Sequence, residues 1–391
     1  MSSNLAGLGR AKFDEMRTLL TRLVSERSVA GSPAIGRCLE IVSEAISPCA
    51  VTVDQLSFDG SPVLVARFGS GSEDRRLTFS GHVDVVPSTP GWESEAFTLA
   101  DRDGHLVGRG TCDMKGGVAA VVTATRALAE IGILDRCSFE LVLTGDEEVG
   151  SAKGTIPLLK AGWITGRAAV CGEPTGLRVF RGSRGLIWAE VTIEGEGGHA
   201  GQAHLLHNPI PTAARLSLAL DSISLSAHDE RFDPPRPSLV VTRLAAGAEL
   251  GAVNVIPDRA QIAIDRRLLP EESLDSAVDQ IKRCIEAQVT SEFRVDFRVL
   301  KKWPGYAVAE NEAIVCQAQV AVQALGYPAD LGTDLAANDS AWLVHAGIPT
   351  VLLGPGEPGQ AHVTGERVST DQVMAAVDVY ATLISQTGAE G

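Results

Sequence analysis

The sequence has no CxxC pair, although seven cysteines are scattered through its 391 residues. Their odd number and wide spacing predict neither a zinc ribbon nor a disulfide framework. It also has no stretch of about 18 apolar residues, the length that a transmembrane helix needs, and no apolar run of signal-peptide length in its first residues. We therefore expect a reduced, cytoplasmic protein with no membrane partner.

Positive charge is scarce, because 34 Lys and Arg residues stand against 49 Asp and Glu residues, a net charge of −15. No basic run is longer than a pair such as Arg266-Arg267 or Lys301-Lys302. The sequence thus lacks the basic stripe of a nucleic-acid binder, and we expect no nucleic-acid partner. An excess of carboxylates can instead accompany a pocket that needs cations to stay folded and ionised.

The composition is that of a folded, globular chain, with 45% apolar and 21% charged residues. A chain of 391 residues exceeds what one compact core usually organises. We therefore expect two domains.

Residues 1–179 alternate between helical and strand-like patterns. The opening helix is predicted from apolar residues at helical spacing, namely Phe13, Met16, Leu19, Leu20, Leu23 and Val24. Short β-branched runs such as 63–68 and LTFSGHVDVV predict strands. Alternation of this kind is typical of an α/β domain with a mostly parallel sheet.

The pattern changes over residues 180–300. LIWAEVTIEG alternates as a half-exposed strand does, PTAARLSLALDSIS and LDSAVDQIKRCIEAQV are helical, and three more segments are strand-like. The α/β pattern returns over 301–391. We predict a discontinuous α/β catalytic domain, residues 1–179 and 301–391, with an inserted α+β domain at 180–300.

Histidine and acidic residues gather in five short segments where predicted strands end, which is where open α/β sheets bind ligands. The segments are Gly81–Asp84, Cys112–Gly117, Gly145–Glu148, Gly172–Thr175 and Ala361-His362. Imidazole mixed with carboxylate suits Zn²⁺, Mn²⁺ or Co²⁺, whereas all-oxygen sites suit Mg²⁺ or Ca²⁺. Taken singly, each segment is also a common surface or turn sequence.

Two pairs within these segments point to metal chemistry. In an extended strand His82 and Asp84 point the same way, so the aspartate can orient one ring nitrogen while the other binds a metal. The adjacent Glu147 and Glu148 cannot share one role, since one can reach a metal while its neighbour takes a proton from bound water. Two like charges so close are costly without cations.

Competing motifs are weak or absent. Gly354, Gly356 and Gly359 fit GxGxxG after a strand, but the prolines between them cannot donate backbone N–H groups to phosphate. The zinc-protease sequence HExxH does not occur, and no serine has triad-like neighbours.

Seven motifs, taken in order, resemble one known family: SGHVDVVP, GRGTCDMKGG, TGDEEVGS, GEPT, GGHAG, NVIPDRAQIAIDRRLLP and GPGEPGQAHVTGE. The family is that of the dinuclear zinc metallohydrolases, which includes acetylornithine deacetylase, succinyl-diaminopimelate desuccinylase, aminoacylase and carboxypeptidase G. The likeness covers nearly the whole chain. It implies that His82, Asp113 and Glu173 hold one ion, that Glu148 and His362 hold the second, and that Asp113 bridges both.

The resemblance also implies roles around the ions. Glu147 matches the family's general base, and Asp84 matches the aspartate behind the first histidine. His199 matches a histidine that reaches the partner subunit's site and stabilises the oxyanion, while Asn254 and Arg267 match residues that grip the substrate carboxylate. The inserted domain would serve as lid and as the interface of a homodimer.

The activity implied is hydrolysis of the amide bond of a small N-acyl amino acid, such as acetylornithine or a succinylated diamino acid. Two divalent ions, Zn²⁺ with Co²⁺ or Mn²⁺ as alternatives, would ionise a shared water. A dipeptidase or carboxypeptidase would use the same metals, and a catalytically silent metabolite-binding protein is the alternative from another class.

Four positions stay open at this point. Arg266 could share the task of Arg267, since the two are adjacent. His204 and His207 either border the pocket or are surface loop residues, because the family's serine-containing turn is replaced here. Cys112 either senses oxidants or is a small buried thiol.

Overall fold

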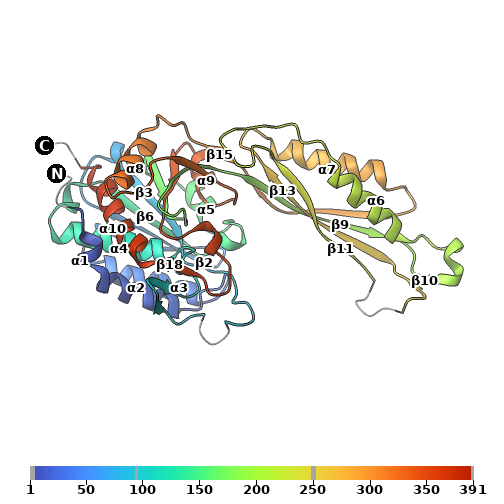
Figure 1. The fold of residues 1–391 in the computed structure, drawn as a ribbon, viewed down its shortest axis with the longest axis horizontal. Helices are drawn as coiled ribbons and strands as arrows, with labels where there is room; N and C mark the ends of the chain where they lie inside the picture. The colour runs from blue at the N-terminus through green and yellow to red at the C-terminus, as the bar shows by residue number, and fades with distance from the viewer. Residues whose placement is uncertain (1–4, 93–95, 248–251, 389–391) are drawn as a thin grey trace. The chain divides into compact units, whose positions relative to one another are not determined.

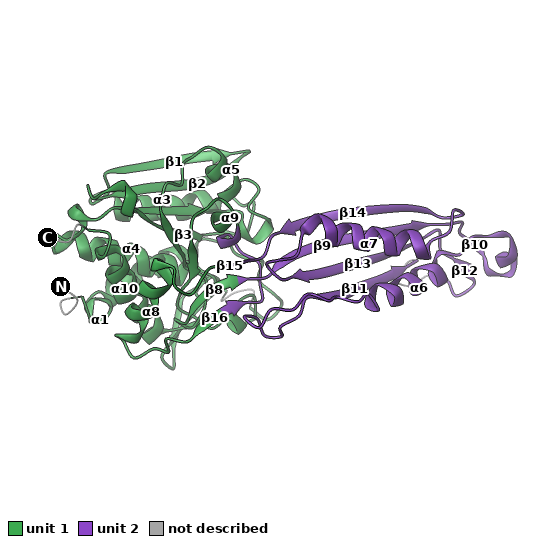
Figure 2. Cartoon of the chain, turned by 90° about the horizontal axis from the view of Figure 1, so that it is seen from above, with its two compact units in different colours: residues 1–182, 308–332, 342–391 green, residues 183–307, 333–341 purple. Residues whose placement is uncertain are grey.

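The computed structural model describes residues 5–92, 96–247 and 252–388, and the chain forms two compact units (Figure 2). Unit 1 consists of Met1–Gly182, Val308–Gly332 and Trp342–Gly391, and unit 2 of Ser183–Ala307 and Thr333–Ala341. The segment Thr333–Ala341 thus clusters with unit 2, although the sequence pattern placed all of 301–391 in the α/β domain. The chain crosses from one unit to the other after Gly182, Ala307, Gly332 and Ala341. Strands β15 (Tyr306–Ala307) and β16 (Leu331–Asp334) lie at the second and third of these crossings.

A large sheet forms the middle of unit 1. Its strands lie in the order β1 (Thr52–Phe58), β2 (Ser61–Phe68), β6 (Phe139–Thr144), β3 (Leu77–His82), β7 (Ala168–Cys171), β17 (Thr350–Leu352) and β8 (Val179–Ser183). The central strands β6, β3, β7 and β17 are parallel, and β1, β2 and β8 add antiparallel pairings at the sides. The predicted α/β fold with a mostly parallel sheet is confirmed.

Helices pack on this sheet (Figure 1). Those of unit 1 are α1 (Leu8–Ala11), α2 (Phe13–Ser25), α3 (Ala34–Ile46), α4 (Lys115–Glu130), α5 (Thr155–Lys160), α8 (Ala313–Gln323) and α10 (Thr370–Ser385), and α9 (Ser340–His345) spans the unit boundary. On one face, Phe79 of β3 meets Tyr380 of α10 edge-on, with 5.2 Å between ring centroids. On the other, Val142 of β6 packs with Leu158 of α5 and Leu343 of α9. Covered on both faces, β3 and β6 are buried at every residue.

A small antiparallel sheet in unit 1 consists of β4 (Ala100–Arg102), β5 (His105–Val107) and β18 (Arg367–Ser369). In it β18 pairs with β5, so that Arg367 lies opposite Val107. This pairing brings the segments that follow β5 and precede β18 side by side, although some 250 residues separate them in the chain.

Unit 2 is built on a four-stranded antiparallel sheet in the order β11 (Ser238–Ala246), β13 (Arg259–Leu268), β9 (Gly185–Glu194) and β14 (Arg294–Trp303). Helices α6 (Pro209–Asp221) and α7 (Leu274–Gln288) lie side by side on one face of it (Figure 1). Ile262 and Ile264 are buried against them, while the residues between alternate toward the open face. A separate pair of short strands, β10 (Gly198–His199) and β12 (Val255–Ile256), completes the unit.

Within the described residues, no helix combines the length and the apolar composition needed to cross a membrane.

Candidate metal centre

The acidic and histidine-bearing segments of unit 1 follow the carboxyl ends of the parallel strands. Strand β3 ends at His82, β6 ends just before the turn that carries Glu147 and Glu148, and β7 ends two residues before Glu173. Because parallel strands end at the same edge of a sheet, their loops meet there. Asp113 reaches this edge from the loop that leads into α4.

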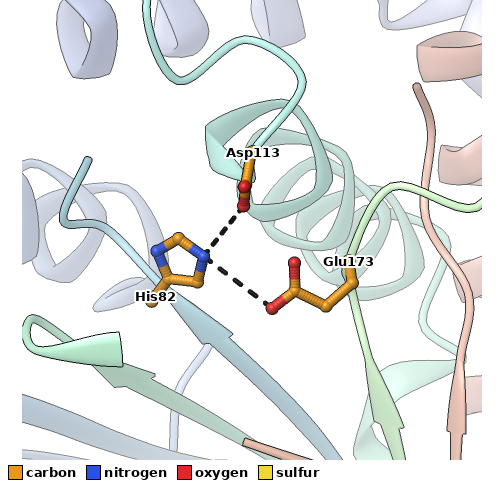
Figure 3. Close-up of side chains that lie close together, drawn as sticks. All are labelled: His82, Asp113 and Glu173. Atoms are coloured by element: carbon orange, nitrogen blue, oxygen red, sulfur yellow. Dashed lines mark hydrogen bonds and ion pairs between the residues drawn. The ribbon is translucent and has the colours of Figure 1, made fainter. Parts of the chain in front are cut away.

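The first group of side chains consists of His82, Asp113 and Glu173, which face one another (Figure 3). Nε2 of His82 lies 3.0 Å from Oδ1 of Asp113 and 3.8 Å from Oε1 of Glu173. One donor atom from each residue lies within 4.8 Å of the others. Three donors so close together can surround one small cation.

The second group consists of Asp113, Glu148 and His362. Nε2 of His362 lies 3.2 Å from Oδ2 of Asp113 and 3.1 Å from Oε2 of Glu148. Asp113 therefore belongs to both groups and turns a different oxygen to each histidine. This is the arrangement that a carboxylate needs to bridge two cations.

The donors in each group are one imidazole nitrogen and two carboxylate oxygens. This mixture suits Zn²⁺, Mn²⁺ or Co²⁺ better than the all-oxygen preference of Mg²⁺ and Ca²⁺. The residues present therefore fit a pair of divalent cations.

The electrostatics of the cluster also favour positive charge. Hydrogen bonds to Asp113 and Glu148 raise the pKa of His362 from 6.5 to about 10. Burial alone would lower the pKa of His82, but its contacts with Asp113 and Asp84 hold that pKa well above 6.5. Burial and the charge of Asp113 raise the pKa of the Glu148 carboxyl. Carboxylates that hold protons on neighbouring imidazoles this strongly will also attract a metal cation.

Asp84 ties the loop of His82 to the turn of the paired glutamates. Its carboxylate accepts the backbone N–H groups of Glu147 at 3.3 Å and Glu148 at 3.1 Å. Nδ1 of His82 is closer to the backbone oxygen of Asp84, at 2.9 Å, than to its carboxylate, at 3.4 Å. The sequence predicts that the carboxylate orients the ring. In the structure that carboxylate also anchors a second loop, which leaves the backbone oxygen as the nearest partner of the ring.

Glu147 is buried and is the first residue of a single 3₁₀ turn, Glu147–Val149. Its neighbour Glu148 contributes to the second group of donors. The hydrogen bonds from the backbone N–H groups of Glu147 and Glu148 to Asp84 fix this turn.

His199 and Asn254 lie together in unit 2, on the paired strands β10 and β12 and the turn before β12. The backbone N–H of Ala200 donates to the backbone oxygen of Asn254 at 2.8 Å. The backbone N–H of Gly201 donates to Nδ1 of His199 at 3.0 Å. Because Nδ1 accepts a hydrogen bond, the neutral ring carries its proton on Nε2. His199 is exposed, so Nε2–H can act as a donor to a ligand.

The structure separates the two adjacent arginines of β13. Arg266 is only 1% exposed and forms an ion pair with Glu272 inside unit 2. Arg267 is partly exposed, and its guanidinium makes two bonds to Asp265, from Nε at 2.8 Å and from Nη2 at 3.0 Å. Asp265 also accepts the indole N–H of Trp188 at 2.7 Å. Arg267 is thus the accessible guanidinium, and Asp265 orients it.

His204, His207 and Cys112 do not join either cation group of the described residues. His204 is an exposed residue of the 3₁₀ helix Ala200–Leu205, and the ring of His207 meets Phe293 edge-on, with 6.1 Å between ring centroids. Cys112 is buried, and its Sγ–H donates to the backbone oxygen of Glu357 at 3.4 Å.

Two buried residues near Asp113, Glu366 and Arg109, were not singled out from the sequence. Oε1 of Glu366 accepts the backbone N–H groups of Cys112 and Asp113, at 2.9 and 3.0 Å. Its Oε2 accepts Nη1 of Arg109 at 2.8 Å. Both residues stand inside quoted motifs, GRGTCDMKGG and GPGEPGQAHVTGE, but no spacing rule joins residues so far apart. The contact appears only in the fold.

Comparison with known proteins places the chain in a family. The profile of "Peptidase family M20/M25/M40" matches residues 78–386. The succinyl-diaminopimelate desuccinylase of Sphingopyxis alaskensis is 33% identical over 291 residues, 71% of this chain and 73% of that protein. The enzyme of the same name from Thioalkalivibrio sulfidiphilus is 27% identical over 382 residues, 94% and 97% of the two chains.

A solved structure supports the same fold. The M20 family metallo-carboxypeptidase Sso-CP2 from Sulfolobus solfataricus superposes with a TM-score of 0.82 at 18% identity, covering 95% of this chain and 98% of that one. The resemblance drawn from the sequence motifs is thereby confirmed.

Proposed function

The chain belongs to peptidase family M20/M25/M40, and on this basis we propose that it hydrolyses the amide bond of a small N-acyl amino acid with two divalent metal ions. The leading substrates are succinylated diamino acids, because several relatives are named succinyl-diaminopimelate desuccinylases, and acetylornithine, which the motif resemblance also implies. The observation that carries the proposal is Asp113, whose two oxygens face two different histidines, His82 and His362.

In this proposal His82, Asp113 and Glu173 hold one ion, and Asp113, Glu148 and His362 hold the other. When bound, two such ions lower the pKa of a shared water so that hydroxide is available near neutral pH. Zn²⁺ is the proposed metal, and Co²⁺ and Mn²⁺ are the alternatives with similar donor preferences.

Glu147 is assigned the proton transfer. Its carboxylate accepts a proton from the attacking water and then donates that proton to the nitrogen of the leaving amine. Support comes from its position next to Glu148 and from the hydrogen bond that Asp84 makes to its backbone N–H. A base held at one place can meet water and leaving group in turn without a large movement.

Residues of unit 2 are assigned to the substrate. Nε2–H of His199 would reach the partner subunit's site and donate to the carbonyl oxygen of the substrate there as negative charge develops. Arg267 and Asn254 would bind the substrate carboxylate, with the guanidinium already oriented by Asp265. The motifs GGHAG and NVIPDRAQIAIDRR support these roles, since both resemble the family pattern. Unit 2 would act as a lid that excludes water from the site.

A dipeptidase or a glutamate-type carboxypeptidase is the second candidate, since one fold neighbour is a metallo-carboxypeptidase. These activities need the same ions but a different pocket for the group on the acyl side of the amide bond. A silent metabolite-binding protein, the candidate from another class, would bind ions and ligand without turnover.

We also propose a homodimer formed through unit 2. Strand β11 is the edge of its sheet and carries the exposed apolar residues Val240 and Leu244, and Leu218 of α6 is 71% exposed. An edge strand with apolar side chains is a common place for a second copy to pair. A cytoplasmic location is proposed because all seven cysteines, which lie within the described residues, are free thiols.

The test is a metal analysis of the purified protein followed by a release assay on one amino acid carrying acetyl, succinyl, formyl or aminoacyl groups. The proposal expects two ions per chain and release of an acyl acid, with activity lost on chelation and regained with Zn²⁺ or Co²⁺. Release only from aminoacyl compounds would favour the peptidase. Ligand binding without release from any compound would favour the silent protein.

A further inference from the structure

Buried carboxylates hold both of the turns that carry the acidic ligands of the second group. Asp84, two residues after His82, accepts the backbone N–H groups of Glu147 and Glu148. Glu366, four residues after His362, accepts those of Cys112 and Asp113. In each case a carboxylate from a histidine-bearing loop binds two consecutive amides of a turn that carries an acidic ligand.

The carboxylate of Glu366 has both of its oxygens engaged. Oε1 takes the two amides, and Oε2 takes Nη1 of Arg109 at 2.8 Å. Glu366 and Arg109 are each 1% exposed, and the guanidinium lies 5.6 Å from the ring of Trp92. A buried ion pair adds little net stability, because both charges must leave water. It can, however, fix the relative position of the segments that it joins.

Backbone contacts join the same two segments. The backbone oxygen of Glu366 accepts the N–H of Gly108 at 3.0 Å. The next residue, Arg367, begins strand β18, which pairs with β5. The loop from Gly108 to Asp113 is therefore bound to the start of β18 by both backbone and side chain.

We propose that Glu366, supported by Arg109, is a positioning residue that sets the distance between Asp113 and His362 and so selectively tightens the second cation site. The inference rests on the proposed metal centre. Glu366 touches no reacting atom and is not a catalytic residue.

The selectivity follows from which ligands each segment carries. The second site takes Asp113 and His362 from the two segments that Glu366 joins, and only Glu148 from elsewhere. The first site takes only Asp113 from them, since His82 is the last residue of strand β3 and Glu173 follows strand β7. Loosening the contact between the two segments should therefore weaken the second site much more than the first.

The experiment is Co²⁺ titration of the metal-free full-length chain, followed by its visible absorption spectrum and by competition with a chelator. Glu366→Gln would keep an oxygen that can accept both backbone N–H groups, and removal of Glu366 alone would leave the buried Arg109 without its charged partner. The main variant is therefore Glu366→Leu combined with Arg109→Met. We expect the wild type to bind two equivalents tightly. We expect the double variant to bind one equivalent normally and the other about 10–100-fold more weakly, as is usual when the support of a ligand is lost.

A His362→Ala variant identifies the weakened site, because the spectrum of its single tight Co²⁺ should match that of the singly loaded double variant. Glu366→Asp guards against a folding defect. It keeps the negative charge near Arg109 but withdraws the carboxylate from the two amides, and it should show the same selective loss.

Glu140→Gln is the matched control. Glu140 is fully buried and accepts the backbone N–H groups of Thr165 and Gly166, both at 2.8 Å, but it lies at the opposite end of β6 from the metal centre. This variant should lose stability and keep both affinities.

Two tight sites with unchanged spectra in the double variant and in Glu366→Asp would overturn the inference, as would equal weakening of both sites. If the wild type itself failed to bind two ions, the proposed metal centre would fall, and this inference with it.

Discussion

Substitution of Asp84 should have two effects that can be measured separately, a lower free energy of unfolding and a lower affinity for metal. Asp84 is fully buried and accepts two backbone N–H groups, those of Glu147 and Glu148. Each buried N–H group left without a partner costs about 1–3 kcal/mol. Asp84→Ala should therefore lower the free energy of unfolding by about 2–6 kcal/mol, a large share of the roughly 5–15 kcal/mol typical of a folded domain. Asp84→Asn keeps one acceptor oxygen and should cost about half as much.

Substitution of Asp84 should also weaken metal binding, because its carboxylate lies 3.4 Å from Nδ1 of His82 and accepts the backbone N–H of Glu148. We expect the affinity of Asp84→Asn for Zn²⁺ to fall about 10–100-fold. The assays are urea denaturation of the metal-free protein and competition with a chromogenic chelator.

The control is Asp378→Asn. Asp378 likewise accepts two backbone N–H groups, from Gly7 at 2.8 Å and Gly9 at 2.7 Å, but it belongs to α10 and contacts none of the metal loops. It should lose stability and keep its affinity for Zn²⁺. Wild-type affinity in Asp84→Asn would refute the reasoning, and so would an equal loss of affinity in Asp378→Asn.

The remaining predictions concern the chemical step and the substrate. Glu147→Gln should keep two ions but lower kcat by about two to four orders of magnitude, since it removes the proton acceptor; turnover close to wild type would reject that role. Arg267→Lys should mainly raise KM for substrates with a free carboxylate, because an ammonium cannot form two parallel bonds, and a carboxamide analogue should show no such change. His199→Ala should lower kcat about 10²–10³-fold with little effect on KM, whereas an effect on KM alone would assign it to binding.

The fold could be predicted well where a single segment carries its own signal. Apolar spacing from Phe13 to Val24 predicts the helix found at Phe13–Ser25, because burial of one face decides the pattern. The alternating LIWAEVTIEG likewise predicts the half-exposed antiparallel strand found at Gly185–Glu194. The segment LTFS also alternates apolar and hydroxyl residues, so the full burial of Leu77–His82 is seen only in the fold. Thr333–Ala341 carries no such signal, and its place in unit 2 depends on contacts far along the chain.

The candidate site shows the same division. The segments that carry His82, Asp113 and Glu173 could be found because they follow predicted strand ends, and the family resemblance then implied these residues as ligands. The fold brings the three side chains together. The contact between Glu366 and the backbone N–H of Asp113 could not be predicted, because the two residues are 253 positions apart in the chain. The sequence also gives no pattern that distinguishes a buried glutamate from an exposed one. The resemblance favoured Arg267 but left a role for Arg266 open, and the burial of Arg266 separates the two.

The measurement that tests the central claim most directly is the metal content of Asp113→Ala beside that of Glu173→Ala. If one carboxylate bridges two cations, Asp113→Ala should lose both ions together, whereas Glu173→Ala should lose only one of the two. An Asp113→Ala protein that still held two ions with wild-type affinity would contradict the account.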